Sequence, residues 1–371
     1  MKFSDVFHLI DLCECHFVLL SFFLCQVSAL AKIITRIRDV LMTASGADSS
    51  SNVQSGSQLM TPAESMSRFI RHTSSKGLSG LAEEYHKIDR EDSICGAYKA
   101  FANNMSKNRY SDVYCIDDTR VVLMLGSNGE GDYIHANVVS FPELQNKFIC
   151  TQGPLQSTLN DFWRMIFQER AETILMLCRP AEEGKPKCCI YWPEPNQKLE
   201  LKTVTVEHIG SESTEFDTIK LKVDLKENLT GTTNGTNSES LIVRQHRWST
   251  WPDRGIPDHE SSLVPLKLLS YVRQSKAPCV VHCSAGIGRT GTVIAIEMGI
   301  KRFEMGQKVD AATLVKDLRR KRAQCIQTEV QYLYLCRVLV EYALQSSEKL
   351  PNDIRNKAAA FLKEYDMKCK K

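Results

Sequence analysis

The chain has 371 residues, 43% hydrophobic and 25% charged, which suits one large globular domain with tails or two small domains. Its formal net charge of +3 is too small to indicate a nucleic-acid-binding protein. The 14 cysteines form no Cys-x2-Cys pair and no zinc-site spacing, so we expect small buried hydrophobic residues in a reducing compartment, and no metal site.

The apolar segment at 17–31, FVLLSFFLCQVSALA, allows three interpretations. It is shorter than the roughly twenty residues that a membrane-spanning helix needs, but it could still anchor the chain, and the basic residues after it would then leave the remainder cytoplasmic. A signal peptide is the second interpretation, although the preceding segment is acidic rather than basic. The third is a tail with no membrane role.

The chain divides into four parts. Residues 1–35 form the N-terminal segment, and residues 36–66 are expected to be a flexible linker, because the stretch ASGADSSSNVQSGSQ is rich in Ser and Gly. Helical spacing of apolar residues marks the start of a folded domain, 67–346. A polar, basic tail at 347–371 is expected to be helical.

The first half of the domain contains short strands and polar loops. The loop KNRYSDV at 107–113 carries an aromatic residue beside a short acid, which in isolation is an ordinary surface turn. ILML at 174–177 is typical of a buried strand, and the charged loop EEGKPKC follows at 182–188. Alternation of polar and apolar residues over 199–223 predicts antiparallel strands, and the polar run at 228–240 predicts a hairpin tip.

The segment WPDRGIP at 251–257 is predicted to be a mobile loop, since Pro and Gly bracket it. It carries one acid, Asp253. A lone Asp in such a loop is usually a turn former. Asp253 therefore indicates a catalytic role only if another reactive group lies near it.

That second site is a strand–loop–helix unit. Val280 and Val281 predict a buried strand, and a buried helix is predicted to start at or near Thr290. The Gly-rich loop between them offers backbone N–H groups and a helix N-terminus, which suit a phosphate dianion. These groups and Arg289 should favour the thiolate of Cys283, while Arg289 can bind two phosphate oxygens. One loop would then hold both nucleophile and electrophile.

A dinucleotide site is the alternative interpretation of this loop. Residues 286–291 also match G-x-G-x-x-G, and Asp310 lies about twenty residues further on. However, Asp310 directly precedes AATL, so we interpret it as a helix N-cap. A dinucleotide loop also has no use for a cysteine three residues before its first glycine.

The segment HCSAGIGRT at 282–290 resembles the signature of the cysteine-dependent protein tyrosine phosphatases, Cys-x5-Arg-[Ser/Thr] after His. Further segments resemble motifs of that family in the same order: KNRYSDV, DYIHAN, FICTQGP, DFWRM, WPDRGIP and QTEVQ. The resemblance covers about residues 67–345. It implies a tyrosine-specific, non-receptor-like enzyme with a single catalytic domain. The implied fold is α/β, with a highly twisted mixed sheet flanked by helices.

The resemblance also implies residue roles. Cys283 is the nucleophile, Arg289 binds the phosphate, and Asp253 acts as general acid and then as base. Thr290 stabilises the returning thiolate, and Gln327 positions the hydrolytic water. The residues of the loop that would surround the phosphate are Ser284, Ala285, Gly286, Ile287 and Gly288.

Other implied roles concern the substrate and the surroundings of the loop. Tyr110 walls a deep cleft that keeps the shorter phosphoserine away from the nucleophile, and Asp112 accepts substrate backbone N–H groups. The supporting residues are Gln331 beside Gln327, Glu182 beside Arg289, Lys187 beside Asp253, and His282. A solvated charge cluster is the alternative interpretation of Glu182 and Lys187.

Three positions depart from the family pattern. Ser111 replaces a residue that is often basic, which would weaken a preference for acidic flanking sequence. His135 replaces Asn and is expected to be structural. Arg254 replaces His, which should change the pH profile or the closure of the loop. A basic run at 319–322 is expected to form a positive rim that attracts phosphopeptides, with a nuclear signal as the alternative.

The predicted function is hydrolysis of phosphotyrosine in proteins through a phosphocysteine intermediate, in the cytoplasm, with no cofactor and no nucleic-acid partner. A pseudophosphatase that only binds phosphotyrosine is the competing class, but it normally lacks the Cys, Arg or Asp, and all three are present. A dual-specificity phosphatase would lack the Tyr110 wall. A phosphoinositide phosphatase usually has basic residues within the loop, where 284–288 has none.

Overall fold

The computed structural model divides the chain into two units, Met1–Gln58 and Leu59–Lys371. All residues whose structure is described belong to the second unit, namely 60–91, 96–126, 129–213, 216–226 and 239–369. The predictions for the apolar segment at 17–31 and for most of the hairpin tip at 228–240 lie outside these residues. No helix in the described ranges has both the length and the apolar character needed to cross a membrane.

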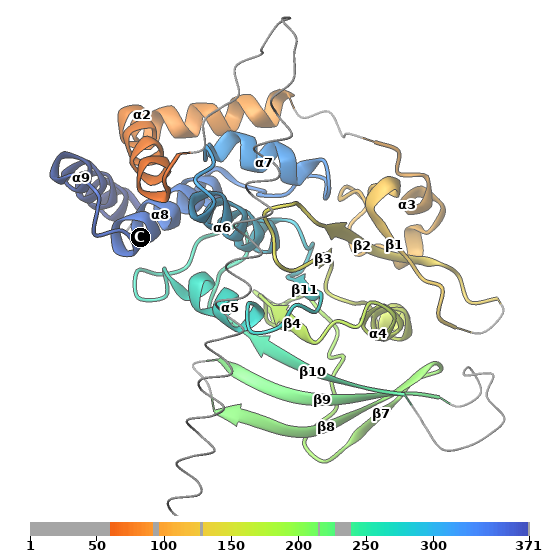
Figure 1. The fold of residues 1–371 in the computed structure, drawn as a ribbon. Helices are drawn as coiled ribbons and strands as arrows, with labels where there is room; N and C mark the ends of the chain where they lie inside the picture. The colour runs from red at the N-terminus through yellow and green to blue at the C-terminus, as the bar shows by residue number, and fades with distance from the viewer. Residues whose placement is uncertain (1–59, 92–95, 127–128, 214–215, 227–238, 370–371) are drawn as a thin grey trace, which may run out of the picture. The chain divides into compact units, whose positions relative to one another are not determined.

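A nine-stranded mixed sheet runs through the second unit (Figure 1), in the order β1-β2-β3-β11-β4-β10-β9-β8-β7. Its strands are β1 (Arg120–Val122), β2 (Tyr133–Val139), β3 (Phe148–Thr151), β4 (Thr173–Met176), β7 (Lys198–Glu200), β8 (Val204–Ser213), β9 (Asp217–Leu225), β10 (Ser240–Arg247) and β11 (Cys279–His282). A separate small hairpin consists of β5 (Ala181–Glu182) and β6 (Lys185–Pro186). The predicted α/β class and the predicted antiparallel strands β7 to β9 are confirmed.

The centre of the sheet is parallel and positions the site. Strands β3, β11, β4 and β10 pair in parallel, and every residue of β3, β4 and β11 is buried. Their apolar sequences fit strands covered on both faces. Because parallel strands end at the same edge of a sheet, the loops after all four emerge together there.

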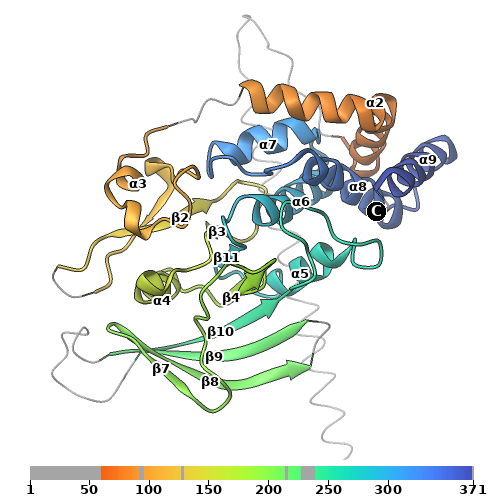
Figure 2. The same cartoon turned by 180° about the vertical axis from the view of Figure 1, so that it is seen from behind.

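The helices gather mostly in one group. They are α2 (Pro62–Glu91), α3 (Lys99–Asn103), α4 (Leu159–Gln168), α5 (Val264–Val272), α6 (Gly288–Glu304), α7 (Ala311–Arg319), α8 (Glu329–Ser346) and α9 (Asn352–Cys369). Short 3-10 turns are η1 (Met105–Lys107), η2 (Asp117–Thr119) and η3 (Gln156–Thr158). Figures 1 and 2 show α2, α6, α7, α8 and α9 together on one side of the sheet, whereas α4 contacts β2 and β8.

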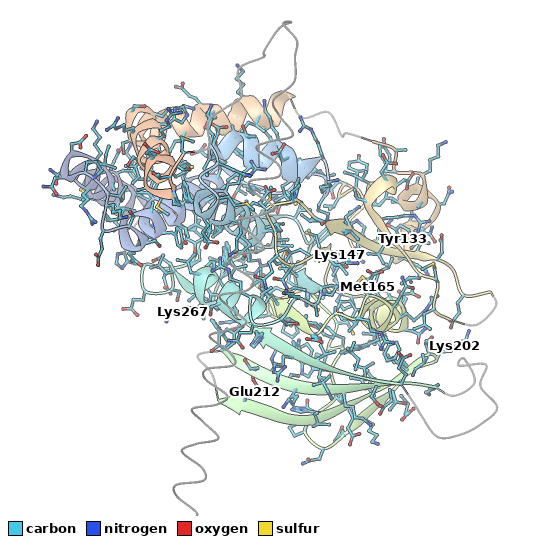
Figure 3. All side chains as sticks on the ribbon, viewed as in Figure 1. Tyr133, Lys147, Met165, Lys202, Glu212 and Lys267 are labelled. Carbon is cyan, nitrogen blue, oxygen red and sulfur yellow. The ribbon has the colours of Figure 1, made fainter. Side chains whose placement is uncertain are left out.

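Side chains fill the space between the sheet and these helices (Figure 3). Met165 on α4 is buried, whereas Lys202 at the turn between β7 and β8 is exposed. Helix α6 is almost entirely buried and begins at Gly288, two residues before the predicted start. The expected C-terminal helix is present as α9, which packs on α2 and α8. The nine cysteines whose side chains are described are all free, and among these nine only Cys189 is not buried.

Helix α7 corrects one expectation and confirms another. Asp310 is its N-cap, with a side-chain oxygen 2.8 Å from the Thr313 nitrogen, as predicted. The helix ends at Arg319, however, and the predicted positive rim is wrong for two of its members. Arg319 is only 5% exposed and Arg322 is 0% exposed, because both guanidinium groups turn inward and donate to backbone carbonyls.

Candidate active site

The loop between β11 and α6, residues 283–289, is called here the phosphate loop. Gly286 has φ of 72°, and a Cβ there would come within 2.1 Å of the Thr151 carbonyl oxygen, so only glycine fits. A Cβ on Gly288 would meet the Gln331 side chain at 2.9 Å. The tight turn brings the Gly286 N–H to 3.3 Å from the sulfur of Cys283, an arrangement that stabilises negative charge on that sulfur.

Arg289 is held rigidly at the end of this loop. Its side chain is 1% exposed and donates to both carboxylate oxygens of Glu182, at 2.7 and 3.0 Å. A third bond goes to the Trp251 carbonyl, at 2.9 Å. Burial by itself would lower the pKa of Arg289, but the hydrogen bonds to Glu182 raise it above its ordinary value. The guanidinium therefore remains charged and fixed in orientation.

The acid loop, residues 251–257, places Asp253 over the phosphate loop. One carboxylate oxygen lies 3.1 Å from Arg289, and the other lies 2.5 Å from the Lys187 amine. Burial by itself would raise the pKa of Asp253, but the hydrogen bond from Lys187 and the charge of Arg289 outweigh it, so the pKa is lowered. Asp253 is therefore a carboxylate in this arrangement.

The substrate loop, residues 107–113, forms another wall. Ser284 donates to the Lys187 carbonyl at 3.1 Å, so the Tyr110 hydroxyl, 2.8 Å away, donates to Ser284. This bond fixes the Tyr110 ring beside the phosphate loop. The Arg109 guanidinium donates to the carbonyls of Gly153 and Pro154, which anchors the loop to the chain after β3.

The start of α8 supplies the last wall. The Gln331 side-chain oxygen accepts from the Gln327 backbone nitrogen at 3.0 Å, and Thr328 donates to the Arg254 carbonyl in the acid loop at 3.0 Å. The buried hydroxyl of Thr290 has no hydrogen-bond partner among the described residues.

These groups surround one cavity of about 580 Å³, called here the reactive cavity. The predicted site residues that line it are Tyr110, Asp112, Lys187, Asp253, Cys283, Ser284, Ala285, Gly288, Arg289, Gln327 and Gln331. Five predicted residues do not line it. They are Glu182, His282, Gly286, Ile287 and Thr290. Glu182 acts on the cavity through Arg289, and His282 hydrogen-bonds Tyr191 inside the protein.

Sequence reasoning missed Arg322. Its side chain lies beneath the phosphate loop and donates to the carbonyls of Gly286 and Ala285, at 3.1 and 2.9 Å. Nothing in the local sequence distinguishes this arginine from its exposed neighbour Arg320, since both belong to one basic run.

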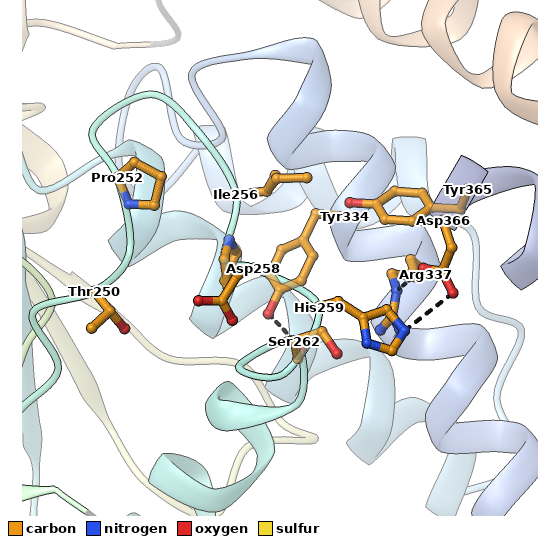
Figure 4. A pocket seen from close by; sticks show the side chains of 11 residues that line it. Thr250, Pro252, Ile256, Asp258, His259, Ser262, Tyr334, Arg337, Tyr365 and Asp366 are labelled. Carbon is orange, nitrogen blue, oxygen red and sulfur yellow. Dashed lines mark hydrogen bonds and ion pairs between the residues drawn. The ribbon is translucent and has the colours of Figure 1, made fainter. Parts of the chain in front are cut away.

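A second cavity, of about 610 Å³, lies between the acid loop, α8 and α9 (Figure 4). Pro252 and Ile256 of the acid loop line it together with residues of α8 and α9. Two ion pairs lie along it, because Asp366 lies 3.3 Å from His259 and 3.6 Å from Arg337.

Several known proteins are similar to this chain in sequence. A sequence model described as protein-tyrosine phosphatase matches residues 104–341. Receptor-type tyrosine-protein phosphatase eta of Mus musculus is 36% identical over 277 residues, covering 73% of this chain and 22% of that protein. Its Homo sapiens counterpart is 37% identical over 282 residues, covering 73% and 20%.

A third relative is tyrosine-protein phosphatase 99A of Drosophila melanogaster, which is 34% identical over 303 residues, covering 76% of this chain and 22% of that protein. The chain thus spans about a fifth of the length of these relatives. The matched region contains the phosphate loop, the acid loop and the substrate loop. The chain belongs to the protein-tyrosine phosphatase family.

Proposed function

We propose that this chain hydrolyses phosphotyrosine in proteins through a phosphocysteine intermediate. The observation that carries this proposal is the convergence of Cys283, Arg289 and Asp253 on one cavity, with Arg289 between the loop that binds phosphate and the acid. A nucleophile, an anion-binding group and a proton donor are the three parts that cleavage of an aryl phosphate needs.

In the first step, the Cys283 thiolate attacks phosphorus, so that an S–P bond forms while the bond from phosphorus to the tyrosine oxygen breaks. Arg289 and the phosphate-loop amides bind the equatorial oxygens, where charge is spread in the transition state. Asp253 gives its proton to the departing phenolic oxygen.

The ion pairs of Asp253 with Arg289 and Lys187 suggest how Asp253 obtains that proton. A bound phosphate dianion takes over Arg289, which removes one of the cations that stabilise the Asp253 carboxylate. The dianion also places like charge beside the carboxylate, which raises its affinity for a proton. Substrate binding thereby converts a carboxylate into the general acid.

In the second step, Gln327 positions a water molecule, and Asp253 removes a proton from it as the new P–O bond forms. The S–P bond breaks and Cys283 leaves as a thiolate. The buried, unpaired hydroxyl of Thr290 would donate to that thiolate. Glu182 holds Arg289, Lys187 holds Asp253, and Gln331 holds Gln327.

Selectivity for tyrosine is attributed to cavity depth. The Tyr110 ring, fixed by its bond to Ser284, walls the entrance, so that only a long aryl phosphate reaches Cys283. Asp112 lies at the rim and would accept backbone N–H groups of the substrate peptide. The proposed partners are therefore phosphotyrosine-containing proteins, with no nucleic acid among them.

We further propose a cytoplasmic location, either free or anchored through residues 17–31. Free cysteines throughout the described ranges suit a reducing compartment. Cell fractionation with a tag at each end tests both statements. Recovery of the chain only from a secreted or luminal fraction would contradict them.

The activity is tested by turnover of matched phosphotyrosine and phosphoserine peptides and of a phosphoinositide. We expect only the phosphotyrosine peptide to be hydrolysed at an appreciable rate. Phosphotyrosine binding without turnover would instead identify a pseudophosphatase. Equal rates on both peptides would contradict the role given to Tyr110.

A further inference from the structure

His135 on β2 lies at the centre of a buried polar chain beneath the reactive cavity. The residue is 2% exposed, and its Nε2 lies 2.9 Å from the carbonyl oxygen of Val113 in the substrate loop. A carbonyl only accepts hydrogen bonds, so Nε2 carries the proton and Nδ1 is an acceptor. Arg322 donates to this Nδ1 from its Nη1, at 3.1 Å.

The other end of the Arg322 guanidinium reaches the phosphate loop. It donates to the carbonyls of Ala285 and Gly286. The peptide bond after Ala285 is planar, so fixing its carbonyl also fixes the N–H of Gly286, which is the group that donates to the Cys283 sulfur. Asn137 accepts from the same Nη1 at 2.8 Å and keeps the arginine in place.

The charge state of His135 suits this arrangement. Burial, together with the nearby charge of Arg322, lowers the pKa of His135 to about 3. The imidazole is therefore neutral at physiological pH and keeps the acceptor that Arg322 uses.

We propose that His135 is a positioning residue that fixes the substrate loop relative to the phosphate loop, through Val113 on one side and Arg322 on the other. This inference rests on the proposed function and deepens it. Asp112, next to Val113, would bind the backbone of a peptide, which a small aryl phosphate does not have. His135 therefore controls how strongly the enzyme prefers peptides over small phosphates.

A second side chain, Gln324, also holds the substrate loop near Val113. Gln324 donates to the Asp112 carbonyl at 2.9 Å and accepts from the Tyr114 nitrogen at 3.1 Å. Losing the His135 contact would therefore loosen the loop without releasing it. The asparagine that the family resemblance leads one to expect at this position is too short to span from Arg322 to Val113.

The test measures kcat/KM for a phosphotyrosine peptide divided by kcat/KM for p-nitrophenyl phosphate. In His135→Ala this ratio should fall about tenfold, the equivalent of one hydrogen bond, mainly through a higher KM for the peptide. A glutamine amide can place an N–H near the position of Nε2, so His135→Gln should restore most of the ratio. An asparagine offers only an acceptor near Nδ1, so His135→Asn should not.

His246→Ala is the matched control, because His246 is also a buried histidine, with a hydroxyl partner, Thr218, on a neighbouring strand. It should lose stability without changing the ratio. If His135→Ala does not fold, the comparison of His135→Gln with His135→Asn decides, and equal ratios overturn the inference. An unchanged ratio in His135→Ala also overturns it. If the wild-type protein hydrolysed neither the phosphotyrosine peptide nor p-nitrophenyl phosphate, the proposed function would be refuted instead.

Discussion

The reactive cavity and the second cavity are similar in volume, about 580 and 610 Å³, and neighbouring residues of the acid loop line them. Asp253 lines the reactive cavity, whereas Pro252 lines the second. Their chemistry differs because of how charge is arranged. In the reactive cavity, the Arg289 and Lys187 cations converge on Asp253 beside a cysteine sulfur that accepts a backbone N–H.

In the second cavity, Asp366 is paired with His259 and Arg337, and Arg337 is paired again with Glu341 along α8. No cysteine is among the described residues that line this cavity, so its ion pairs have no thiol beside them. The comparison teaches that volume does not indicate chemistry. In the reactive cavity a ligand can replace one partner of an ion pair, since a bound phosphate would pair with Arg289 in place of Asp253.

The largest effect is expected from Cys283→Ser. A serine hydroxyl is a far weaker nucleophile than a thiolate, so turnover of a phosphotyrosine peptide should fall by about 10⁴-fold or more. Peptide affinity, measured by calorimetry, should be retained. Cys189→Ser is the control, since Cys189 lies outside the cavity lining and should keep activity within about twofold. Robust turnover in Cys283→Ser would end the proposed mechanism.

Asp253→Asn should have the next largest effect. Loss of the proton donor should lower kcat by about 10² to 10⁴-fold while KM changes little, as steady-state kinetics would show. Asp258→Asn is the matched change in the second cavity and should leave kcat within about threefold, because an asparagine oxygen can still accept from the Ser261 N–H, as Asp258 does. If kcat fell equally in Asp253→Asn and Asp258→Asn, catalysis could not be assigned to the reactive cavity rather than to the second cavity.

Lys187→Gln should change the pH profile more than the maximal rate. In the proposed mechanism Asp253 donates a proton, so kcat/KM should fall as pH rises through the Asp253 pKa of the free enzyme. Lys187 lowers that pKa, and its removal should raise it, which moves the basic limb to higher pH. Lys185→Gln, which removes an exposed cation from the same cavity rim, should leave the limb in place. If the basic limb of the kcat/KM profile moved to lower pH in Lys187→Gln, Lys187 would not be the group that lowers the Asp253 pKa.

The smallest effect is expected from His259→Gln in the second cavity, which breaks the pair with Asp366 and leaves the pair between Arg337 and Asp366 in place. The side chains of His259 and Asp366 are 59% and 27% exposed, so their pair should contribute about 1 kcal/mol or less to the free energy of unfolding, measured in urea. Turnover should stay within about twofold. A tenfold loss of kcat would show that the second cavity acts on the acid loop, and the comparison would fail.

The parts of the site that lie within one segment could be predicted from the sequence. The loop from Cys283 to Arg289 sits between an apolar strand and a buried helix, and both elements are where periodicity placed them, apart from a helix start two residues early. Asp310 is the predicted cap for the same reason, because capping depends on residues three apart.

The family resemblance implied that Glu182 lies beside Arg289 and Lys187 beside Asp253, but the local sequence did not, and the tertiary structure supplies the contacts. Glu182 reaches Arg289 from the β5–β6 hairpin, and Lys187 reaches Asp253, because the strand order brings their loops to one edge of the sheet. Local sequence has no periodicity that encodes such pairing. Arg322 shows most clearly what the local sequence does not reveal. It belongs to a basic run that would be expected to be exposed, yet it is buried and donates to the carbonyl of Gly286, which is distant in the sequence.

The sequence by itself therefore indicated the phosphate loop and the nucleophile that we propose there, since the expected spacing from cysteine to arginine lies within one continuous segment. The tertiary structure decided how the backbone of that loop is held, by Arg322 and by His135, which accepts from Arg322. The physical reason is that a buried charge or imidazole is stable only where distant partners satisfy it, and those partners meet only after the sheet has formed.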